Sequence, residues 1–274
     1  MRCGAALAAF LSLPVLAAAQ EVAPNRSTVY LHPTDVHDPR ALWVNPAGLG
    51  VLREASVYAE VAVQDPGTGA GRLRQLNAGF NSRGLAFAYQ RDLFDGGRRG
   101  HTYRLGLAGS AKGLAAGAAM ALYRGGTKGT GWDFGVSYAF EGAAALTVGG
   151  VIANIGQPVV RGLEQRLTFI PGATWRPLGP AAALSMHARI TPDSVMAYAF
   201  GLSWQGSGGR WPLGVLARLD TDGGLRRGAF AIGISVGGPD RVGLVASTPG
   251  DLSGVGTASI WGLSTRQPSA TQHH

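Results

Sequence analysis

Residues 132–140 alternate strictly between large apolar and small or polar side chains, and this pattern constrains the fold more than any other feature of the chain. Successive side chains of a β-strand point to opposite faces. One face is therefore bulky and apolar, while the other carries Asp133, Gly135, Ser137 and Ala139. A water-soluble sheet would bury the bulky face against a second layer. A transmembrane barrel would turn that face to lipid and the small face to its lumen.

The first twenty residues predict export from the cytoplasm. Arg2 precedes an apolar run at residues 5–15, and small residues follow up to Ala19. This order is typical of a secretory signal peptide, here residues 1–19, cleaved near Ala19. The apolar run is too short to span a membrane as a helix. Cys3 is the only cysteine, so we expect a mature chain without disulfides or thiolate metal sites.

The composition of the remaining chain favours a membrane barrel. About 255 residues suffice for one closed barrel or one large domain. The sequence has 43 glycines, only 15% charged residues and a mean hydropathy of +0.10. Disordered chains are less hydrophobic than this, and no later run of 18 apolar residues predicts a transmembrane helix.

The net charge of +8 raises the question of nucleic-acid binding. The basic residues are scattered, however, and several fall in expected turns, such as Arg98 and Arg99. For an exported chain, contact with anionic lipid head groups explains this charge better than a nucleic-acid surface. We therefore expect outer-membrane lipid, and no nucleic acid, as a partner.

Alternation like that of residues 132–140 recurs along the chain and predicts about fourteen strands. Residues 114–123 are rich in Ala, which favours a helix by propensity, but Gly113 and Gly117 favour a strand. Pro171 lies within the weaker segment 167–175 and predicts a bulge or a break in pairing. The clearest alternating segments are residues 56–63, 85–90, 103–110, 184–190, 196–204 and 229–236.

The predicted connections between strands alternate between long and short. Long links are expected at residues 65–72, 92–102, 125–131 and 154–166, and tight ones at 81–84, 111–113, 141–142, 178–180 and 238–240. One pair departs from the pattern, because the link at 191–193 is short and that at 205–210 is longer. Outer-membrane barrels have long outer loops and short periplasmic turns. The sequence therefore predicts a closed, antiparallel, all-β transmembrane barrel at residues 54–266 in a Gram-negative outer membrane, with both termini periplasmic and a polar tail at 267–274.

Alternation directs several charged or titratable side chains into the predicted lumen. Buried charges need partners, so one interpretation is that these residues pair with one another or with the N-terminal segment. The other is a basic lumen that attracts an anionic head group such as a carboxylate. For Asp133 we expect one of the inward arginines as partner. The candidates are Glu60, Arg104, Asp133, Arg176, His187, Arg189, Arg218 and Arg241.

Residues 20–53, which precede the first strand, do not alternate. A short apolar segment at 41–44 leads into Asn45, Pro46, Ala47, Gly48 and Leu49. Asn-Pro commonly starts a turn, and glycine permits a positive φ or a close approach of backbones. We predict that residues 20–53 form a hatch, or plug, inside the lumen.

Through Asp38, Ala41 and the motif at residues 45–49, this segment resembles outer-membrane barrels of the FadL long-chain fatty-acid transporter and PorV type. The resemblance implies about fourteen strands around an N-terminal hatch, and a barrel that binds or passes small hydrophobic molecules. Two alternatives stay open: a non-conducting PorV-like scaffold or secretion partner, and an orphan barrel module related to those fused to signal peptide peptidases. The end of the chain departs from many such barrels, because Trp261 and Leu263 precede a polar tail instead of a terminal aromatic.

No motif in the sequence predicts catalysis. His32, Asp35, His37 and Asp38 lie close together, but their spacing matches no established metal-ligand pattern. A glycine-rich loop between a strand and a helix is absent from the pattern, as is a nucleophile elbow. We therefore expect no catalytic residues, no metal and no cofactor, and as partners a hydrophobic small molecule or a secretion or periplasmic protein.

Overall fold

The computed structural model describes residues 28–66, 72–93, 99–125, 129–140, 145–160, 163–206, 211–249 and 254–266. The predicted signal peptide (1–19), the start of the predicted hatch (20–27) and the polar tail (267–274) lie outside the described residues. Among the residues that are described, no helix has the length and apolar character needed to cross a membrane.

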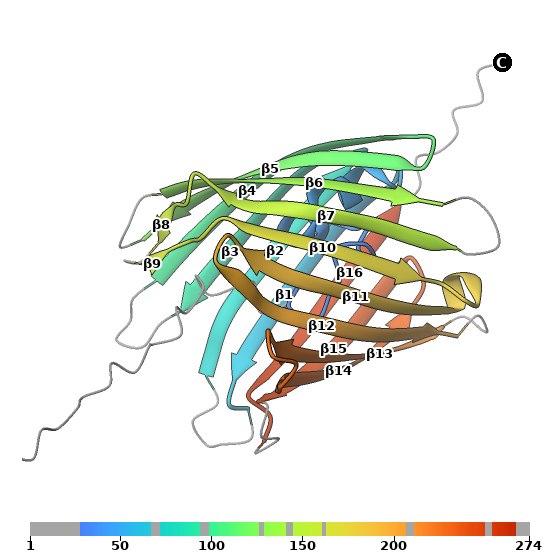
Figure 1. Ribbon diagram of the computed structural model, residues 1–274. Coiled ribbons are helices and arrows are strands. Elements are labelled where there is room, and N and C mark those ends of the chain that lie inside the picture. Colours follow the sequence, from blue (N-terminus) through green and yellow to red (C-terminus); the bar gives the residue numbers. More distant parts are fainter. Residues whose placement is uncertain are drawn as a thin grey trace, which may run out of the picture.

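Fourteen antiparallel strands form a closed barrel (Figure 1). The last strand pairs with the first over the full length of both, from Ala55 opposite Arg266 to Gln64 opposite Thr257. This confirms the predicted fold class and strand count. The barrel strands are β1 (Ala55–Gln64), β2 (Arg72–Ser82), β3 (Leu85–Leu93), β4 (Arg99–Ala111), β5 (Leu114–Arg124), β6 (Gly129–Ala139), β7 (Leu146–Ile155), β10 (Thr168–Trp175), β11 (Ala182–Thr191), β12 (Ser194–Gln205), β13 (Leu213–Asp222), β14 (Arg227–Gly237), β15 (Asp240–Pro249) and β16 (Thr257–Arg266).

The outer wall of the barrel is apolar, and the bulky face of β6 lies on it. Trp132, Phe134 and Val136 are 43%, 48% and 53% exposed, whereas Asp133 and Ser137 between them are buried. The alternation therefore separates an outer from an inner face, as predicted. Exposed aliphatic and aromatic side chains also occur on the outer faces of the other barrel strands. A surface of this kind is unfavourable in water.

The two ends of the barrel differ in their connections. At one end, the turn end, β1 begins, β16 ends, and tight links such as 83–84, 112–113 and 238–239 join the strands. The opposite end, the loop end, carries most of the longer connections. Two predicted tight links are wrong. β6 ends at Ala139 and β7 begins only at Leu146, where Ala145 has a positive φ that a strand does not adopt. β10 ends at Trp175 and β11 begins only at Ala182, with the 3-10 helix η3 (Gly179–Ala181) between them.

Two segments that were ambiguous in the sequence form strands. The Ala-rich residues 114–124 form β5, since pairing with both β4 and β6 outweighs helix propensity. Pro171 pairs in register with Gly150 of β7, but on the β11 side the ladder is interrupted between Phe169 and Gly172. Proline has no N–H to donate, so the predicted break in pairing is confirmed.

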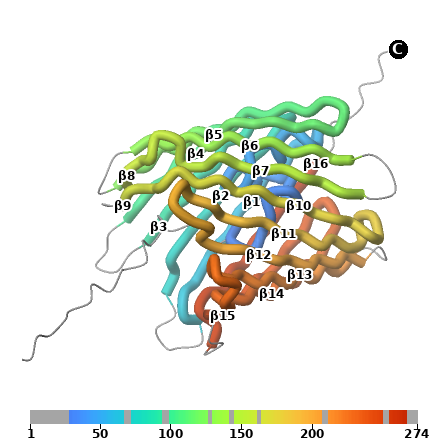
Figure 2. The backbone as a smooth tube through the Cα atoms, viewed as in Figure 1, coloured from blue at the N-terminus to red at the C-terminus, as the bar shows by residue number. Residues whose placement is uncertain are grey.

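Residues 28–50, which we term the inner segment, lie inside the ring of strands (the blue tube in Figure 2). The inner segment contains α1 (Ala41–Val44) and the 3-10 helix η1 (Pro46–Gly50), which contacts β4, β5 and β6. Asn45 caps η1 by accepting a hydrogen bond from Ala47 N–H at 3.1 Å. The side chains of Leu42 and Leu49 are fully buried, so this segment forms the apolar core of the lumen.

The long connection between β7 and β10 contains a small hairpin that the sequence analysis did not predict. It consists of β8 (Val159–Val160) and β9 (Leu163–Glu164). Val160 is buried against Ala121 and Tyr123, both on the inner face of β5. The hairpin therefore packs against the inner wall at the loop end.

Candidate functional site

Inward-facing glycines make room for the inner segment. A Cβ atom added to Gly135 of β6 would collide with the Asn45 side chain, and one on Gly117 of β5 would collide with the Pro46 carbonyl. A Cβ on Gly106 of β4 would meet the Leu42 side chain. The glycines on the inner face of these three strands therefore leave the space that α1 and η1 occupy.

Polar side chains of the wall bind backbone carbonyls of the inner segment. Arg104 Nη1 donates to Leu42 O at 2.9 Å, and Arg218 Nη1 donates to Leu31 O at 2.7 Å. Hydrogen bonds to buried carbonyls also satisfy groups that would be costly to leave unpaired. The wall therefore holds the segment at both its beginning and its helical part.

Two ion pairs connect residues that are far apart in the sequence. Arg104 Nη1 lies 2.7 Å from Asp133 Oδ2, which confirms the expectation that an inward arginine pairs with Asp133. Arg176, just after β10, lies 2.5 Å from Asp35 of the inner segment. The first pair links two wall strands, and the second links the wall to the inner segment.

Two buried histidines form a further contact between the inner segment and the wall. His32 Nδ1 and His187 Nδ1 of β11 are 3.0 Å apart, and the rings meet edge to face with 4.9 Å between centroids. One nitrogen must donate and the other accept, so at least one ring is neutral. Burial and, to a smaller extent, the charge of Arg218 lower the pKa of His32 to about 3.

The Arg40 side chain of the inner segment is surrounded by one acidic and several aromatic side chains. It pairs with Asp38 at 2.5 Å and donates to the Tyr30 hydroxyl at 2.9 Å. Its guanidinium lies over the Trp261 ring at 4.6 Å and the Tyr58 ring at 5.6 Å. Burial alone would raise the pKa of Asp38, but Arg40 holds the pKa of this carboxyl below its usual value.

The remaining predicted lumen residues differ in their surroundings. Glu60 is buried and accepts a hydrogen bond from Tyr58. Arg218, besides its bond to the inner segment, pairs with Asp220 at 2.6 Å. Arg189 lines a cavity at the loop end. Arg241 of β15 lines the larger cavity at the turn end, and within the described part of the chain its Nε has no hydrogen-bond partner.

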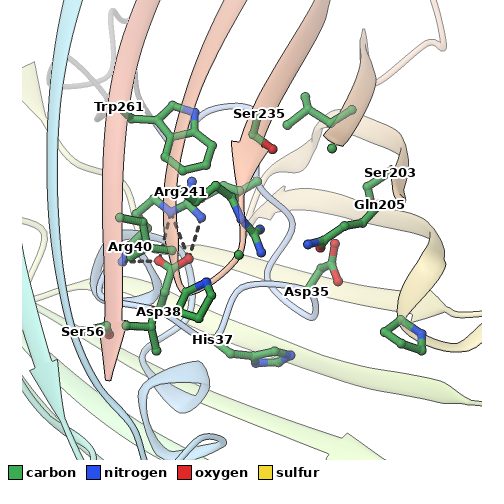
Figure 3. Close-up of a pocket in the computed structure, with 18 of the residues that line it drawn as sticks. Asp35, His37, Asp38, Arg40, Ser56, Ser203, Gln205, Ser235, Arg241 and Trp261 are labelled. Atoms are coloured by element: carbon green, nitrogen blue, oxygen red, sulfur yellow. Dashed lines mark hydrogen bonds and ion pairs between the residues drawn. The ribbon is translucent and has the colours of Figure 1, made fainter. Parts of the chain in front are cut away.

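The larger cavity, of about 1000 Å³, opens at the turn end and is lined on one side by the inner segment (Figure 3). We term it the turn-end cavity. Its wall is apolar around Trp261, Leu216 and Leu263, and polar around Arg176 and Arg241. Asp35, Asp38, Glu54 and Asp240 also line it, and three of these carboxylates are paired with arginines. The cavity therefore offers both charged and apolar surface.

A smaller cavity of about 400 Å³, the loop-end cavity, lies on the other side of the inner segment. Thr28, Val29 and Trp43 line it from the inner segment, and Arg104 and His187 line it from the wall. Leu31 lines both cavities. The inner segment is therefore the partition between them.

His37 and Asp35 of the partition line the turn-end cavity. Burial and, to a smaller extent, the nearby Arg176 lower the pKa of His37 to about 4, so that its imidazole is neutral at neutral pH. Burial raises the pKa of Asp35, although the Arg176 guanidinium acts in the opposite direction.

The four residues considered as metal ligands in the sequence do not converge. Asp35 and Asp38 are each paired with an arginine, and His32 contacts His187. No group of three or more potential ligands is arranged around a common point within the described ranges. Asp35 and His32 instead connect the inner segment to the wall.

The sequence analysis did not predict several side-chain contacts that attach the inner segment to the wall. Tyr30, Arg40 and Trp261 form one cluster, and Thr34 contacts Thr174 of β10 at 2.7 Å between hydroxyl oxygens. The available signal was the density of polar residues at 28–40 in a segment without strand alternation. The partners, however, are more than 100 residues away.

Comparison with known proteins finds no family model and no curated protein that matches the sequence. Solved structures with a similar arrangement include a FadL homologue of Pseudomonas aeruginosa, with 10% identity over 85% of this chain and 94% of that one, at a TM-score of 0.49. The KdgM porin has 8% identity over 77% and 99%, at a TM-score of 0.42. A mutant of the Rh. blastica porin has 9% identity over 78% and 99%, at a TM-score of 0.38. The barrel fold is therefore assigned from the strand pairing of this chain itself.

Proposed function

We propose that this protein is an outer-membrane β-barrel that binds small hydrophobic molecules with an anionic head and passes them across the membrane, with the inner segment as its hatch. The observation that carries the proposal is the partition of the lumen. An amphiphilic cavity of about 1000 Å³ lies on one side of residues 28–50, and a second cavity lies on the other.

The outer wall supports a location in a membrane. Lipid-facing strands expose an apolar surface and close into a barrel because no backbone group can stay unpaired in hydrocarbon. The outer faces of the strands carry large apolar side chains, and every barrel strand pairs on both sides. We assign the turn end to the periplasm, because short links are typical of the periplasmic side of such barrels.

The surface chemistry of the turn-end cavity supports the class of ligand. Arg241, whose Nε has no hydrogen-bond partner among the described residues, is suited to a carboxylate or another anionic head. Trp261, Leu216 and Leu263 are suited to an apolar chain. Movement of the hatch away from Gly106, Gly117 and Gly135 would connect this cavity with the loop-end cavity. The ligand would then follow the lumen.

Uptake into liposomes tests this function. Liposomes that contain the barrel should take up a fluorescent fatty acid, and uptake should be faster after deletion of residues 20–50. Absence of uptake in both forms, although both insert and show a heat-dependent shift in gel mobility, would remove the transport proposal.

A scaffold role is favoured by one specific observation, the number of contacts that hold the inner segment. Hydrogen bonds to Leu31, Leu42 and Leu49 carbonyls, and the Asp35–Arg176 ion pair, all favour a closed lumen. A scaffold of the PorV-like type should co-purify with a secretion or periplasmic protein in detergent extracts, and should not transport fatty acid.

A further inference from the structure

Three basic side chains form a row across adjacent strands on the outer wall of the barrel, near the loop end. Arg91 of β3 is paired with His101 of β4, and His101 is paired with Arg124 of β5. Asp92 and Thr102 follow Arg91 and His101 along their strands and are buried in the lumen. Neighbouring side chains of a strand point to opposite faces, so the row faces outward. Directly opposed residues on neighbouring strands have Cβ atoms about 5 Å apart, which makes this one continuous basic surface.

We propose that Arg91, His101 and Arg124 bind the phosphate groups of a bisphosphorylated lipid. This inference rests on the proposed membrane location of the barrel. It concerns the outer wall, and it is independent of transport through the lumen.

The row lies at the edge of an apolar surface. The neighbouring row toward the middle of the barrel is Tyr89, Tyr103 and Leu122 in register. Still closer to the middle the same strands present further apolar side chains, such as Leu105 and Met120. Tyrosines concentrate at the boundary between hydrocarbon and head groups. The basic row is therefore at the level where lipid phosphates lie.

No carboxylate of the described strands β2 to β6 faces outward beside the row. The five strands β2 to β6 contain two carboxylates, Asp92 and Asp133, and both are buried in the interior. Arg91 Nε is shielded from solvent and has no hydrogen-bond partner among the described residues. A bound phosphate would be stabilised by the guanidinium groups of Arg91 and Arg124.

The side chains of the row are partly oriented for a ligand. His101 Nδ1 and the Tyr89 hydroxyl are 2.7 Å apart, and the two rings stack with 5.9 Å between centroids. This contact fixes the imidazole and leaves Nε2 for another partner. Arg124 uses Nη1 for the Tyr123 carbonyl, which leaves its other N–H groups for phosphate oxygens.

The length of the row favours a head group with two phosphates. Three adjacent strands span two strand spacings, or about 10 Å. Arg99, two residues before His101 on β4, is exposed on the same face and extends the basic surface toward the loop end. Elsewhere at this end Arg166 already pairs with Asp193 at 3.1 Å, so the surface of β3 to β5 is the stronger candidate.

The test compares two triple variants of the folded full chain in detergent micelles, with binding of bisphosphoryl lipid A measured by native mass spectrometry. Arg91→Gln/His101→Gln/Arg124→Gln removes the row. Arg166→Gln/Arg226→Gln/Arg227→Gln removes three basic residues from the same end and serves as the matched control. We expect a loss of affinity of about tenfold or more in the first variant, and about twofold or less in the control.

Monophosphoryl lipid A and phosphatidylglycerol provide the chemical controls, and both should bind more weakly than bisphosphoryl lipid A. Equal binding of either lipid, or equal loss of affinity in the two triple variants, would overturn the proposal. The heat-dependent shift in gel mobility shows separately whether each variant folds as a barrel. A folded variant with unchanged lipid binding contradicts this inference alone, whereas loss of the shift in the unmodified chain contradicts the proposed membrane barrel.

Discussion

Arg104 of β4 and Asp133 of β6 form an ion pair across the inner face of β5, with 2.7 Å between Nη1 and Oδ2 and each side chain 12% exposed. Arg104 also donates to the Leu42 carbonyl, and Asp133 also accepts the N–H of Asn154. One pair thus connects three wall strands with the inner segment.

Asp133→Asn should destabilise the barrel strongly, because it leaves the Arg104 cation buried without its anion. The cost of breaking a buried pair by removal of one partner is about 3 kcal/mol or more. Urea unfolding of the barrel in lipid vesicles measures it. The matched control is Asp193→Asn, which breaks the exposed pair with Arg166 and should cost about 1 kcal/mol or less. Equal losses in the two variants would contradict the assigned burial.

Gly135→Ala should displace the inner segment while the strands stay paired. The added Cβ would collide with the Asn45 side chain, so η1 must move away from this strand. We expect faster hydrogen exchange at residues 40–50, with little change in the strands. Gly262→Ala, where an added Cβ has no atom within 4 Å, should leave exchange unchanged. Slow exchange in both variants would show that the contact with Gly135 does not position the segment.

Acid should weaken the contact between His32 and His187. The pKa of His32 in the folded protein, about 3, lies below the ordinary value of 6.5, so the released segment binds protons more readily. The stability of the docked segment is complete above about pH 6.5 and decreases as the pH falls toward 3, by about 2–3 kcal/mol at pH 4.5.

Hydrogen exchange at residues 28–40, corrected for the intrinsic effect of pH, measures this weakening. His32→Asn should make the pH dependence shallower, because the amide cannot be protonated in this range. An equally steep pH dependence in this variant would assign the effect to other groups, such as Asp35.

The faces of the strands followed from the sequence, whereas the contacts of the lumen did not. Alternation alone placed Arg104, Asp133 and His187 inside, since a strand has only two faces. Their partners depend on the register of neighbouring strands and on the path of residues 28–50. His32 and His187, for example, are 155 positions apart. A periodic pattern carries no information on such distances.

Three differences in the fold have local causes. The link before β7 is longer than predicted because Ala145 has a positive φ and does not continue the ladder. The link before β11 is longer because residues Gly179–Ala181 form a 3-10 helix. The β8–β9 hairpin has only two residues in each strand, too few for period-two alternation to be recognised. It forms through burial of Val160 against Tyr123, a tertiary contact.

Arg241→Gln should weaken binding of a fatty acid in the turn-end cavity by about tenfold, the effect of losing one charge-assisted hydrogen bond. Arg241 faces the cavity, and its Nε has no partner among the described residues. Arg266→Gln is the matched control, because Arg266 lies at the same end but pairs with Asp240 at 2.7 Å. Titration of the detergent-solubilised barrel with a fatty acid and with its methyl ester measures both variants. The ester lacks the anionic head, so its affinity should be the same in all three proteins. A loss of affinity for the ester as large as that for the acid would show that Arg241 shapes the cavity and does not bind the head group.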